Sequence, residues 1–437
     1  MSSSTSLEGC SQSVVEYIVE NLTLDDIRNL RLSCNSLAFK CSGYRFKTFF
    51  HTKHVDVTPA SVREFAQDIC LGGFRCQLRN LCLIGIVDQT QPQSEITDNS
   101  LRDEYAKLFS QAFVEIAKHA IDGISLTLQV IVIIEDLDRL RRALPANANV
   151  GWSKRTALKA RVWQCTAELF GATMSALSAS KLPIKKLDIF NGPDLHQCSL
   201  SCEELAKIDW SDTGLIASLG ALKSLSISLS NPRDLSEGPS DAVWRADAEH
   251  AEKTYWGLAR LIQVCNHLEE LDLHLTWLTT AYGRSFSQEM ILQRVVELDK
   301  LPTLKRCALH GIHARQCDLL AFIKRTKVKE LHLVGVCLSG GTFRPIMKYC
   351  SSGEANMTAL FFEWLHERHA EFGNFTIIFF AKAEETSSLR EFLGFYQLQR
   401  TGTSVRLPIG YEHPPTWPIG SPIMAAWLRK NNLEFVG

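Results

Sequence analysis

A short apolar pattern that recurs along the chain constrains the fold more than any other feature of the sequence. The pattern is apolar-x-x-apolar-x-apolar, and seven copies lie between residues 78 and 333 of the 437. The copies are Leu78, Leu81, Leu83; Ile121, Ile124, Leu126; Ile184, Leu187, Ile189; Leu222, Leu225, Ile227; Leu268, Leu271, Leu273; Leu304, Cys307, Leu309; and Val328, Leu331, Leu333. Segments with helical periodicity precede most copies, most clearly at 105–117. This alternation predicts stacked αβ units, each of which buries its apolar face only against its neighbours.

The predicted fold class is therefore α/β, with a curved solenoid of irregular repeats and one parallel sheet over residues 56–342. Successive copies begin 24 to 63 residues apart, so the loops absorb the irregularity. Segments that bear proline, glycine or asparagine predict three such loops, at 88–100, 144–152 and 230–241.

Both ends of the chain lack the repeated pattern. Residues 1–10 are rich in serine and predict a mobile tail. Residues 343–437 predict an irregular C-terminal cap over the open edge of the last repeat. That region holds a strand pattern at 375–380 and then the prolines Pro408, Pro414, Pro415, Pro418 and Pro422.

Residues 11–55 predict a short helical module. Val14, Val15, Ile18 and Leu22 fall on one stripe of a first helix. Thr23 is placed to cap a second helix, because Asp25 and Asp26 follow it in the turn where the helix dipole favours negative charge. The stripe continues through Ile27, Leu30, Cys34, Leu37 and Cys41. A helical core this small needs a neighbour, which is either the rest of the chain or a second protein.

Charge and cysteine content indicate the kind of partner and compartment. Forty-seven basic against 48 acidic residues give no overall field that would attract nucleic acid or an anionic membrane, so neither is an expected partner. Fourteen scattered cysteines without a basic or apolar leader predict reduced thiols and an intracellular protein, cytoplasmic or nuclear. The most apolar windows, 124–134 and 375–381, are shorter than the roughly 20 residues of a membrane helix.

The segment 13–34 (SVVEYIVENLTLDDIRNLRLSC), followed by 35–39 (NSLAF), resembles an F-box. Together with 48–55 (TFFHTKHV) and the repeats behind it, it looks like the divergent F-box and leucine-rich-repeat proteins common in filamentous fungi. The family usually opens with Leu-Pro and a glutamate two residues later, whereas here the aligned positions are Cys10, Ser11 and Ser13.

The resemblance implies that the helices bind the Skp subunit of an SCF-type cullin-RING ubiquitin ligase, and through it a cullin. The residues expected to carry that contact are the apolar ones of the module: Val14, Val15, Ile18, Leu22, Leu24, Ile27 and Leu30. The resemblance further implies that the repeats hold a target protein and that catalysis belongs to other subunits. The alternative is an interaction scaffold that never enters a ligase, with the helices as a cap on the repeats.

Polar residues at alternate strand positions predict where a target would bind, because strand side chains alternate between the two faces of a sheet. They are Lys186, Asp188, Ser226, Glu270, Asp272, His274, Arg306, His310, Glu330 and His332, with Ser224 and Ser228 beside them. Stacked strand by strand, they predict one concave surface of mixed charge. The alternative is a solvated face with no ligand.

Catalytic and cofactor motifs give weak signals or none. Cys307, His310, His313 and Cys317 have side chains that zinc accepts, but not the paired arms of a structural zinc site. His366 and His369 lie three residues apart rather than the four of a metalloprotease helix. Phosphate-binding glycine loops and nucleophile elbows are absent from the sequence. We therefore predict no enzyme activity, metal or cofactor.

Overall fold

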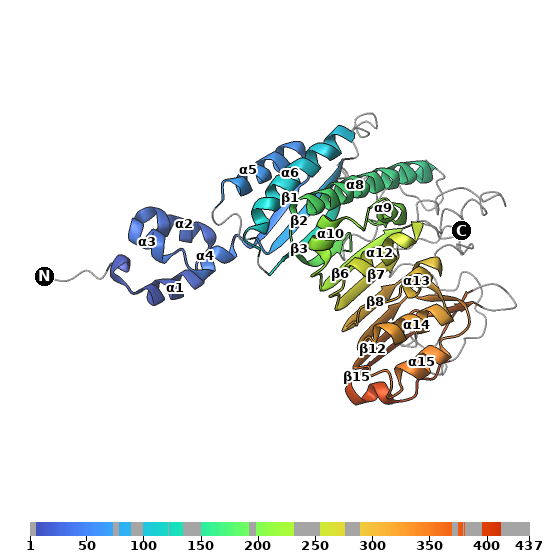
Figure 1. Cartoon of the computed structure of the whole chain (residues 1–437). Coiled ribbons are helices and arrows are strands. Elements are labelled where there is room, and N and C mark those ends of the chain that lie inside the picture. The colour runs from blue at the N-terminus through green and yellow to red at the C-terminus, as the bar shows by residue number, and fades with distance from the viewer. Residues whose placement is uncertain are drawn as a thin grey trace.

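The computed structural model describes residues 6–72, 78–88, 99–120, 122–133, 150–191, 198–230, 254–275, 289–368, 375–378, 380 and 396–411. Its buried apolar side chains form two separate clusters, one in the N-terminal helices and one in a large sheet with its helices. Figure 1 shows the N-terminal helices apart from the sheet and joined to it through β1 (Thr52–Asp56). The sequence predicts that the small helical core packs on either the rest of the chain or a second protein. The rest of the chain does not share its buried cluster.

The helical module consists of a single turn, η1, and four helices. Their bounds are η1 Leu7–Gly9, α1 Gln12–Glu20, α2 Leu24–Ser33, α3 Asn35–Lys40 and α4 Tyr44–Thr48. The predicted cap at Thr23 is confirmed: its hydroxyl accepts from the Asp26 amide, and the Asp26 carboxylate accepts from the Thr23 amide. The stripe predicted to run on to Cys41 is broken at Cys34, which is extended and caps α3 through its sulfur.

The predicted N-terminal tail is described in part. Residues 1–5 lie outside the described residues, but η1 lies within the tail. The Lys40 ammonium donates to the backbone oxygens of Glu8 and Cys10, both at 2.7 Å. Charge-assisted hydrogen bonds of this kind connect the segment to α3, and the mobility of the tail stays a prediction.

The large sheet is almost wholly parallel. Its strand order is β1-β2-β3-β4-β6-β7-β8-β10-β12-β15, and β5 adds to β6. Neighbours pair in parallel except β12 with β15, which is antiparallel. Beyond β1 the strands are β2 Asn80–Asp88, β3 Ile124–Ile133, β4 Ile184–Ile189, β5 Leu200–Ser201, β6 Ser224–Ser230, β7 Glu270–Leu275, β8 Arg306–His310, β10 Glu330–Val334, β12 Ala359–Glu363 and β15 Gln397–Thr401. The predicted α/β class with a parallel sheet is confirmed.

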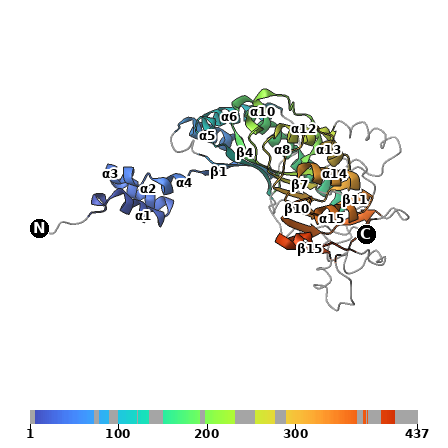
Figure 2. The same ribbon diagram turned by 60° about the horizontal axis from the view of Figure 1, so that its bottom comes forward.

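The helices of this part cover one face of the sheet (Figures 1 and 2). They are α5 Pro59–Cys70, α6 Asn99–Ala117, α8 Val150–Ser180, α9 Cys202–Ala206, α10 Thr213–Leu219, α12 Trp256–Val264, α13 Glu289–Val296, α14 Gln316–Thr326 and α15 Arg344–Cys350. Every described member of the seven apolar copies is buried beneath them. Ile121 lies outside the described residues. The repeated pattern therefore marks the strand positions that face the helices.

A second, four-stranded sheet continues three of these strands beyond a sharp turn. It has the order β14-β13-β11-β9, with β9 His313–Arg315, β11 Cys337–Gly340, β13 His366–Arg368 and β14 Phe375–Ile377. Each turn has a positive φ just after a strand, at Gly311 (66°), Gly335 (62°) and Trp364 (53°). Two glycines adopt this conformation without strain, and the Trp364 ring stacks on Tyr396 at a centroid distance of 4.1 Å.

Two of the three predicted domain boundaries fall within the large sheet. The boundary at residue 55 falls inside β1, which pairs with β2. The region after 342 contains α15 and β12, and β12 pairs in parallel with β10. Met357, Leu360 and Phe362 are an eighth copy of the apolar pattern, and all three are buried.

The strand predicted at 375–380 is limited to three residues in β14, and Pro414, Pro415, Pro418 and Pro422 lie outside the described residues.

The predicted loops lie largely outside the described residues. Of the loop at 144–152, the structure places Val150 and the two residues after it in α8. Of the other two loops, the ends that the structure describes belong to strand β2, to helix α6 and to strand β6. Helices and strands therefore extend into the ends of the segments that the turn-forming residues predict as loops.

The packing of α8 against α10 predicts the effect of one small substitution. Asp212 caps α10 by accepting from the Leu215 amide at 2.8 Å, and the Ser178 hydroxyl donates to the same carboxylate at 2.7 Å. A Cβ on Gly214 would lie 2.0 Å from the backbone oxygen of Ser178. We expect Gly214→Ala to lower the free energy of unfolding by roughly 2–3 kcal/mol, because the two helices must separate to admit the methyl group. Urea denaturation measures this.

A matched control is Gly340→Ala. The Cβ added there meets no atom within 4 Å, so stability should stay within about 0.5 kcal/mol of the wild type. An equal loss in both variants would contradict the close contact between α8 and α10.

Candidate functional site

The strand register brings the predicted polar residues together on the face of the sheet opposite the helices. They form three rows across neighbouring strands. The amino row is Lys186, Ser224, Glu270, Arg306 and Glu330; the middle row is Asp188, Ser226, Asp272, Ala308, His332 and Phe361; the carboxyl row is Ser228, His274, His310, Val334 and Glu363. We call these rows the polar face. All ten residues predicted to bind a target belong to it, and their binding role stays a prediction.

The polar face is accessible to a partner from its amino row. Lys186, Glu270, Arg306 and Glu330 are exposed, whereas the middle row is half-buried apart from Ala308, which is buried. Figure 2 shows the sheet below the layer of helices, with the strands running along the side that no described helix covers. The rows therefore offer a polar surface with an exposed rim and a more sheltered centre.

The centre of the polar face is built around Asp272. The His310 Nε2 lies 3.4 Å from Asp272 Oδ1, and the rings of His274 and His310 have centroids 5.4 Å apart. In the next strands, the His332 ring packs at 5.6 Å from the Phe361 ring. One pair of rings thus lies beside the Asp272 carboxylate, and a second pair lies two and three strands further along the same face.

Burial shifts the ionisation of this centre. Desolvation raises the pKa of Asp272, an effect that His274 and Arg306 partly offset. Desolvation, aided by His332 and Arg306, lowers the pKa of His310 to about 4. The pKa of His332 is lowered, again chiefly by desolvation and then by Arg306. Both imidazoles are therefore neutral near pH 7, and their rings add no positive charge to the centre.

One end of the centre is fixed by the turn after β4. Phe190 has a positive φ of 57°, which turns the chain so that Asn191 lies over the strands. The Asn191 amide side chain donates to the Ser226 hydroxyl at 2.6 Å, and its backbone N–H donates to Asp188 Oδ1 at 3.1 Å. Desolvation raises the pKa of Asp188 despite this hydrogen bond. Asp188 and Ser226 are thereby held in one orientation.

Sequence reasoning missed three residues of this region. Phe361 and Glu363 lie on β12, and the eighth copy of the apolar pattern at 357–362 could have revealed both. Asn191 follows a strand at a turn, and no periodic signal in the sequence points to it.

The helical module presents a different apolar surface from the one predicted. Val15 and Ile27 are fully buried in the module's own core, so they do not reach a partner, and the prediction is wrong for these two. Leu22, Leu24 and Leu30 pack against that core, and Ile18 is half-buried. Of the predicted set only Val14 is well exposed, at 47%. The other large exposed apolar side chains of the module are Tyr17, Leu32, Phe39 and Tyr44, each at least 72% exposed.

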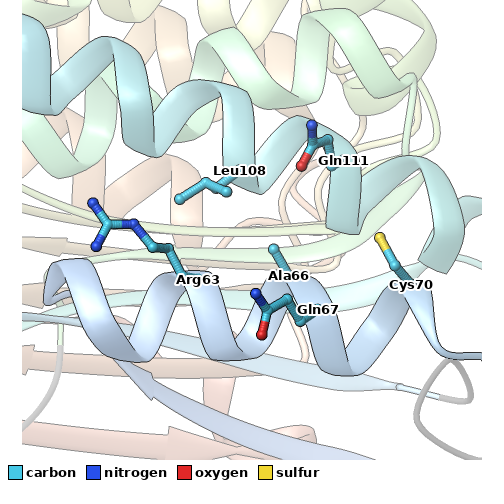
Figure 3. A pocket seen from close by; sticks show the side chains of 6 residues that line it. All are labelled: Arg63, Ala66, Gln67, Cys70, Leu108 and Gln111. Atoms are coloured by element: carbon cyan, nitrogen blue, oxygen red, sulfur yellow. The ribbon is translucent and has the colours of Figure 1, made fainter.

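A shallow pocket lies between α5 and α6, on the helical side of the molecule (Figure 3). It is lined by Arg63, Ala66, Gln67, Cys70, Leu108 and Gln111 and has a volume of about 310 Å³. Arg63 forms an ion pair with Glu104 at 2.7 Å. Among the described residues that line the pocket, Cys70 is the one nucleophile, and neither an imidazole nor a carboxylate accompanies it there. This lining lacks the pairing of nucleophile and base that covalent catalysis needs.

Within the described part of the chain, no three His, Cys, Asp or Glu side chains come together in a way that could hold a metal ion. Of the weak zinc candidates, Cys307 is buried among the repeat leucines, whereas Cys317 is exposed. His369 lies outside the described residues. The described cysteines are free thiols. A membrane-crossing helix is likewise absent from the described residues.

Comparison of the sequence with protein-family models and with curated proteins finds no match to either.

Proposed function

We propose that this chain is a substrate-recognition adaptor of an SCF-type cullin-RING ubiquitin ligase, without catalytic activity of its own. In this proposal the helical module binds the Skp subunit, and the αβ units are irregular leucine-rich repeats whose polar face binds a target protein. The observation that carries the proposal is a helical module with its own core and exposed aromatic side chains, joined to a sheet whose polar face no described helix covers. Such an adaptor acts in the cytoplasm or the nucleus.

The composition of the module's surface supports a protein partner. Tyr17, Phe39 and Tyr44 are 72–79% exposed, and Leu32 is 84% exposed. Isolated exposed apolar residues are ordinary, but aromatic residues are typical of the energetic centres of protein interfaces. Val14 and Tyr17 lie one helical turn apart on α1, so they share a face of that helix. We therefore infer that the module binds its partner through these exposed side chains rather than through Val15 and Ile27.

The alternative function is a repeat scaffold that never enters a ligase. The departure at Cys10, Ser11 and Ser13 favours it, because the family's Leu-Pro opening is absent. In that case the helices serve as a cap on the repeats. Separate apolar cores in the module and in the sheet favour the adaptor over the cap, because a cap contributes side chains to the core that it closes.

Removal of residues 1–50 separates the two functions. The truncated chain keeps β1 and keeps His51, whose backbone oxygen accepts from the amides of Arg79 and Asn80. For an adaptor we expect calorimetric titration to show that the full chain binds purified Skp subunit and that the truncated chain does not. We also expect the melting temperature of the repeats to change by less than about 2 °C, because no buried apolar cluster is cut.

The contrary result is equally specific. A truncated chain whose repeats melt many degrees lower, together with a full chain that does not bind the Skp subunit, would identify the helices as a cap and support the scaffold.

A further inference from the structure

The polar face carries an excess of negative charge at its strands β4 to β12. It holds five carboxylates, Asp188, Glu270, Asp272, Glu330 and Glu363, against the two cations Lys186 and Arg306. Leaving the histidines aside, the formal charge of these seven residues is −3, although the whole chain has a formal charge of only −1. A local field of this sign favours a cationic partner and repels an acidic one.

The two cations lie at the rim of the face rather than in its centre. Lys186 and Arg306 both belong to the exposed amino row, where Glu270 and Glu330 balance them. The middle and carboxyl rows contain the acidic residues Asp188, Asp272 and Glu363, and none of the positions that the strand pairings place in these two rows is a lysine or arginine. The excess negative charge is therefore concentrated at the half-buried centre.

Aromatic rings lie among these carboxylates. His274 and His310 form one pair of rings, and His332 and Phe361 form another on the adjacent strands. Flat rings next to carboxylates suit a guanidinium group, which stacks on a ring face and donates paired hydrogen bonds to a carboxylate. An ammonium group can pair with the carboxylates but lacks the planar surface that stacks.

We propose that the polar face binds an arginine-bearing segment of a target protein, with one guanidinium group at the His274–His310 pair beside Asp272 and another at the His332–Phe361 pair beside Glu363. The inference rests on the proposed function only in naming the ligand as a ligase target. A neutral segment would further desolvate the half-buried carboxylate of Asp272 and bring no additional counter-charge, which opposes its binding. The amino row, with both signs of charge, then orients the rest of the segment along the strands.

The test uses the full chain and short fluorescein-labelled peptides in which arginine alternates with glycine and serine. Matched peptides carry lysine, glutamine or glutamate in place of every arginine. Fluorescence anisotropy compares the wild type with a variant that carries Asp272→Asn and Glu363→Gln. The control variant carries Asp103→Asn and Glu64→Gln, which make the same two chemical changes at exposed positions on α6 and α5.

We expect the arginine peptide to bind the wild type about tenfold more tightly than the glutamine peptide and at least about threefold more tightly than the lysine peptide. The double variant should lose about tenfold in affinity for the arginine peptide, and the control should stay within about twofold. A third variant, His332→Ala with Phe361→Ala, should reduce the preference for arginine over lysine, because it removes one of the two ring pairs.

Three results would overturn the inference: equal binding of the arginine and glutamine peptides, equal binding of the arginine and lysine peptides, or wild-type affinity in the double variant. These outcomes are independent of the ligase. A chain that binds the Skp subunit but shows no arginine preference refutes the inference and leaves the proposed function intact. A chain that shows the arginine preference but does not bind the Skp subunit supports the inference and contradicts the proposed function.

Discussion

Exchange of Tyr17 and Phe39 for aspartate together should weaken binding of the Skp subunit by at least about a hundredfold. Both side chains are more than 70% exposed, so their replacement removes contact area without opening the module's core. Each new carboxylate would have to be desolvated against an apolar partner surface, which adds a cost to the lost contacts. Calorimetric titration of the Skp subunit into the full-length variant measures the change.

The control for this prediction adds the same charge elsewhere on the module. Asn29→Asp and Asn35→Asp place two carboxylates at exposed positions of α2 and α3. We expect the affinity of this control to fall by less than about threefold, because no large apolar side chain is removed. Circular dichroism of both variants should match the wild type. Retained binding in the Tyr17 and Phe39 variant would contradict the assignment of these side chains to the interface.

The second large effect is a loss of stability in mild acid. His313 and His366 lie on β9 and β13 of the four-stranded sheet and are 7% and 9% exposed. Burial lowers the pKa of each from 6.5 to about 4, and the pKa of His310 falls to the same value. Between these two pH values the unfolded chain takes up protons that the folded chain does not, so protonation favours unfolding.

The expected magnitude follows from the size of these shifts. Above pH 6.5 these histidines do not reduce the free energy of unfolding. As the pH falls from 6.5 towards 4, the free energy of unfolding decreases by about 2–3 kcal/mol for each of His313 and His366. The raised pKa values of Asp188 and Asp272 act in the opposite direction, because the folded chain binds those protons more readily. Their effect begins at the acidic end of the range and reduces the loss there.

Urea denaturation across this pH range measures the loss. His313→Gln should reduce the number of protons taken up on unfolding by up to one, so that the free energy of unfolding depends less steeply on pH. His267→Gln, at an exposed position, should leave this dependence unchanged. A stability that does not change between pH 6.5 and 4 would contradict the burial of these histidines.

The large sheet could be predicted from the sequence because its signal is periodic. Leu187, Leu225 and Leu271 occupy the same position in three successive units, and the register places them on one buried row. The same strand period of two predicts that Asp188 and Asp272 lie on the opposite face, as they do. An apolar period therefore predicts both what is buried and which polar residues share the other face.

The helical module shows where this reasoning fails. Val14, Val15 and Ile18 lie on one stripe, but the core takes Val15 and leaves Val14 exposed. An apolar stripe on a short helix indicates that another surface covers it. The sequence does not show whether that surface belongs to the module's own helices or to a partner protein. Exposure of Tyr17 and Phe39 depends on how α1 and α3 cross, which is set by tertiary packing and not by helical period.

The eighth unit is hidden in the sequence for a different reason. Met357 and Phe362 are less typical than leucine at the repeat positions, and the prolines from residue 408 onwards favour an irregular cap. The turns at Gly311, Gly335 and Trp364 share one register, but two different residue types occupy them, so the sequence shows no common turn signal. Their equivalence emerges only when the strands are aligned in space.

The most direct test of the adaptor role is to mix the full chain with the Skp subunit and its cullin and to measure the mass of the eluted species by size-exclusion chromatography with light scattering. We expect one complex with one copy of each protein, which the Tyr17→Asp, Phe39→Asp variant fails to join. Elution of the full chain by itself at micromolar concentrations would contradict the adaptor role and favour the repeat scaffold.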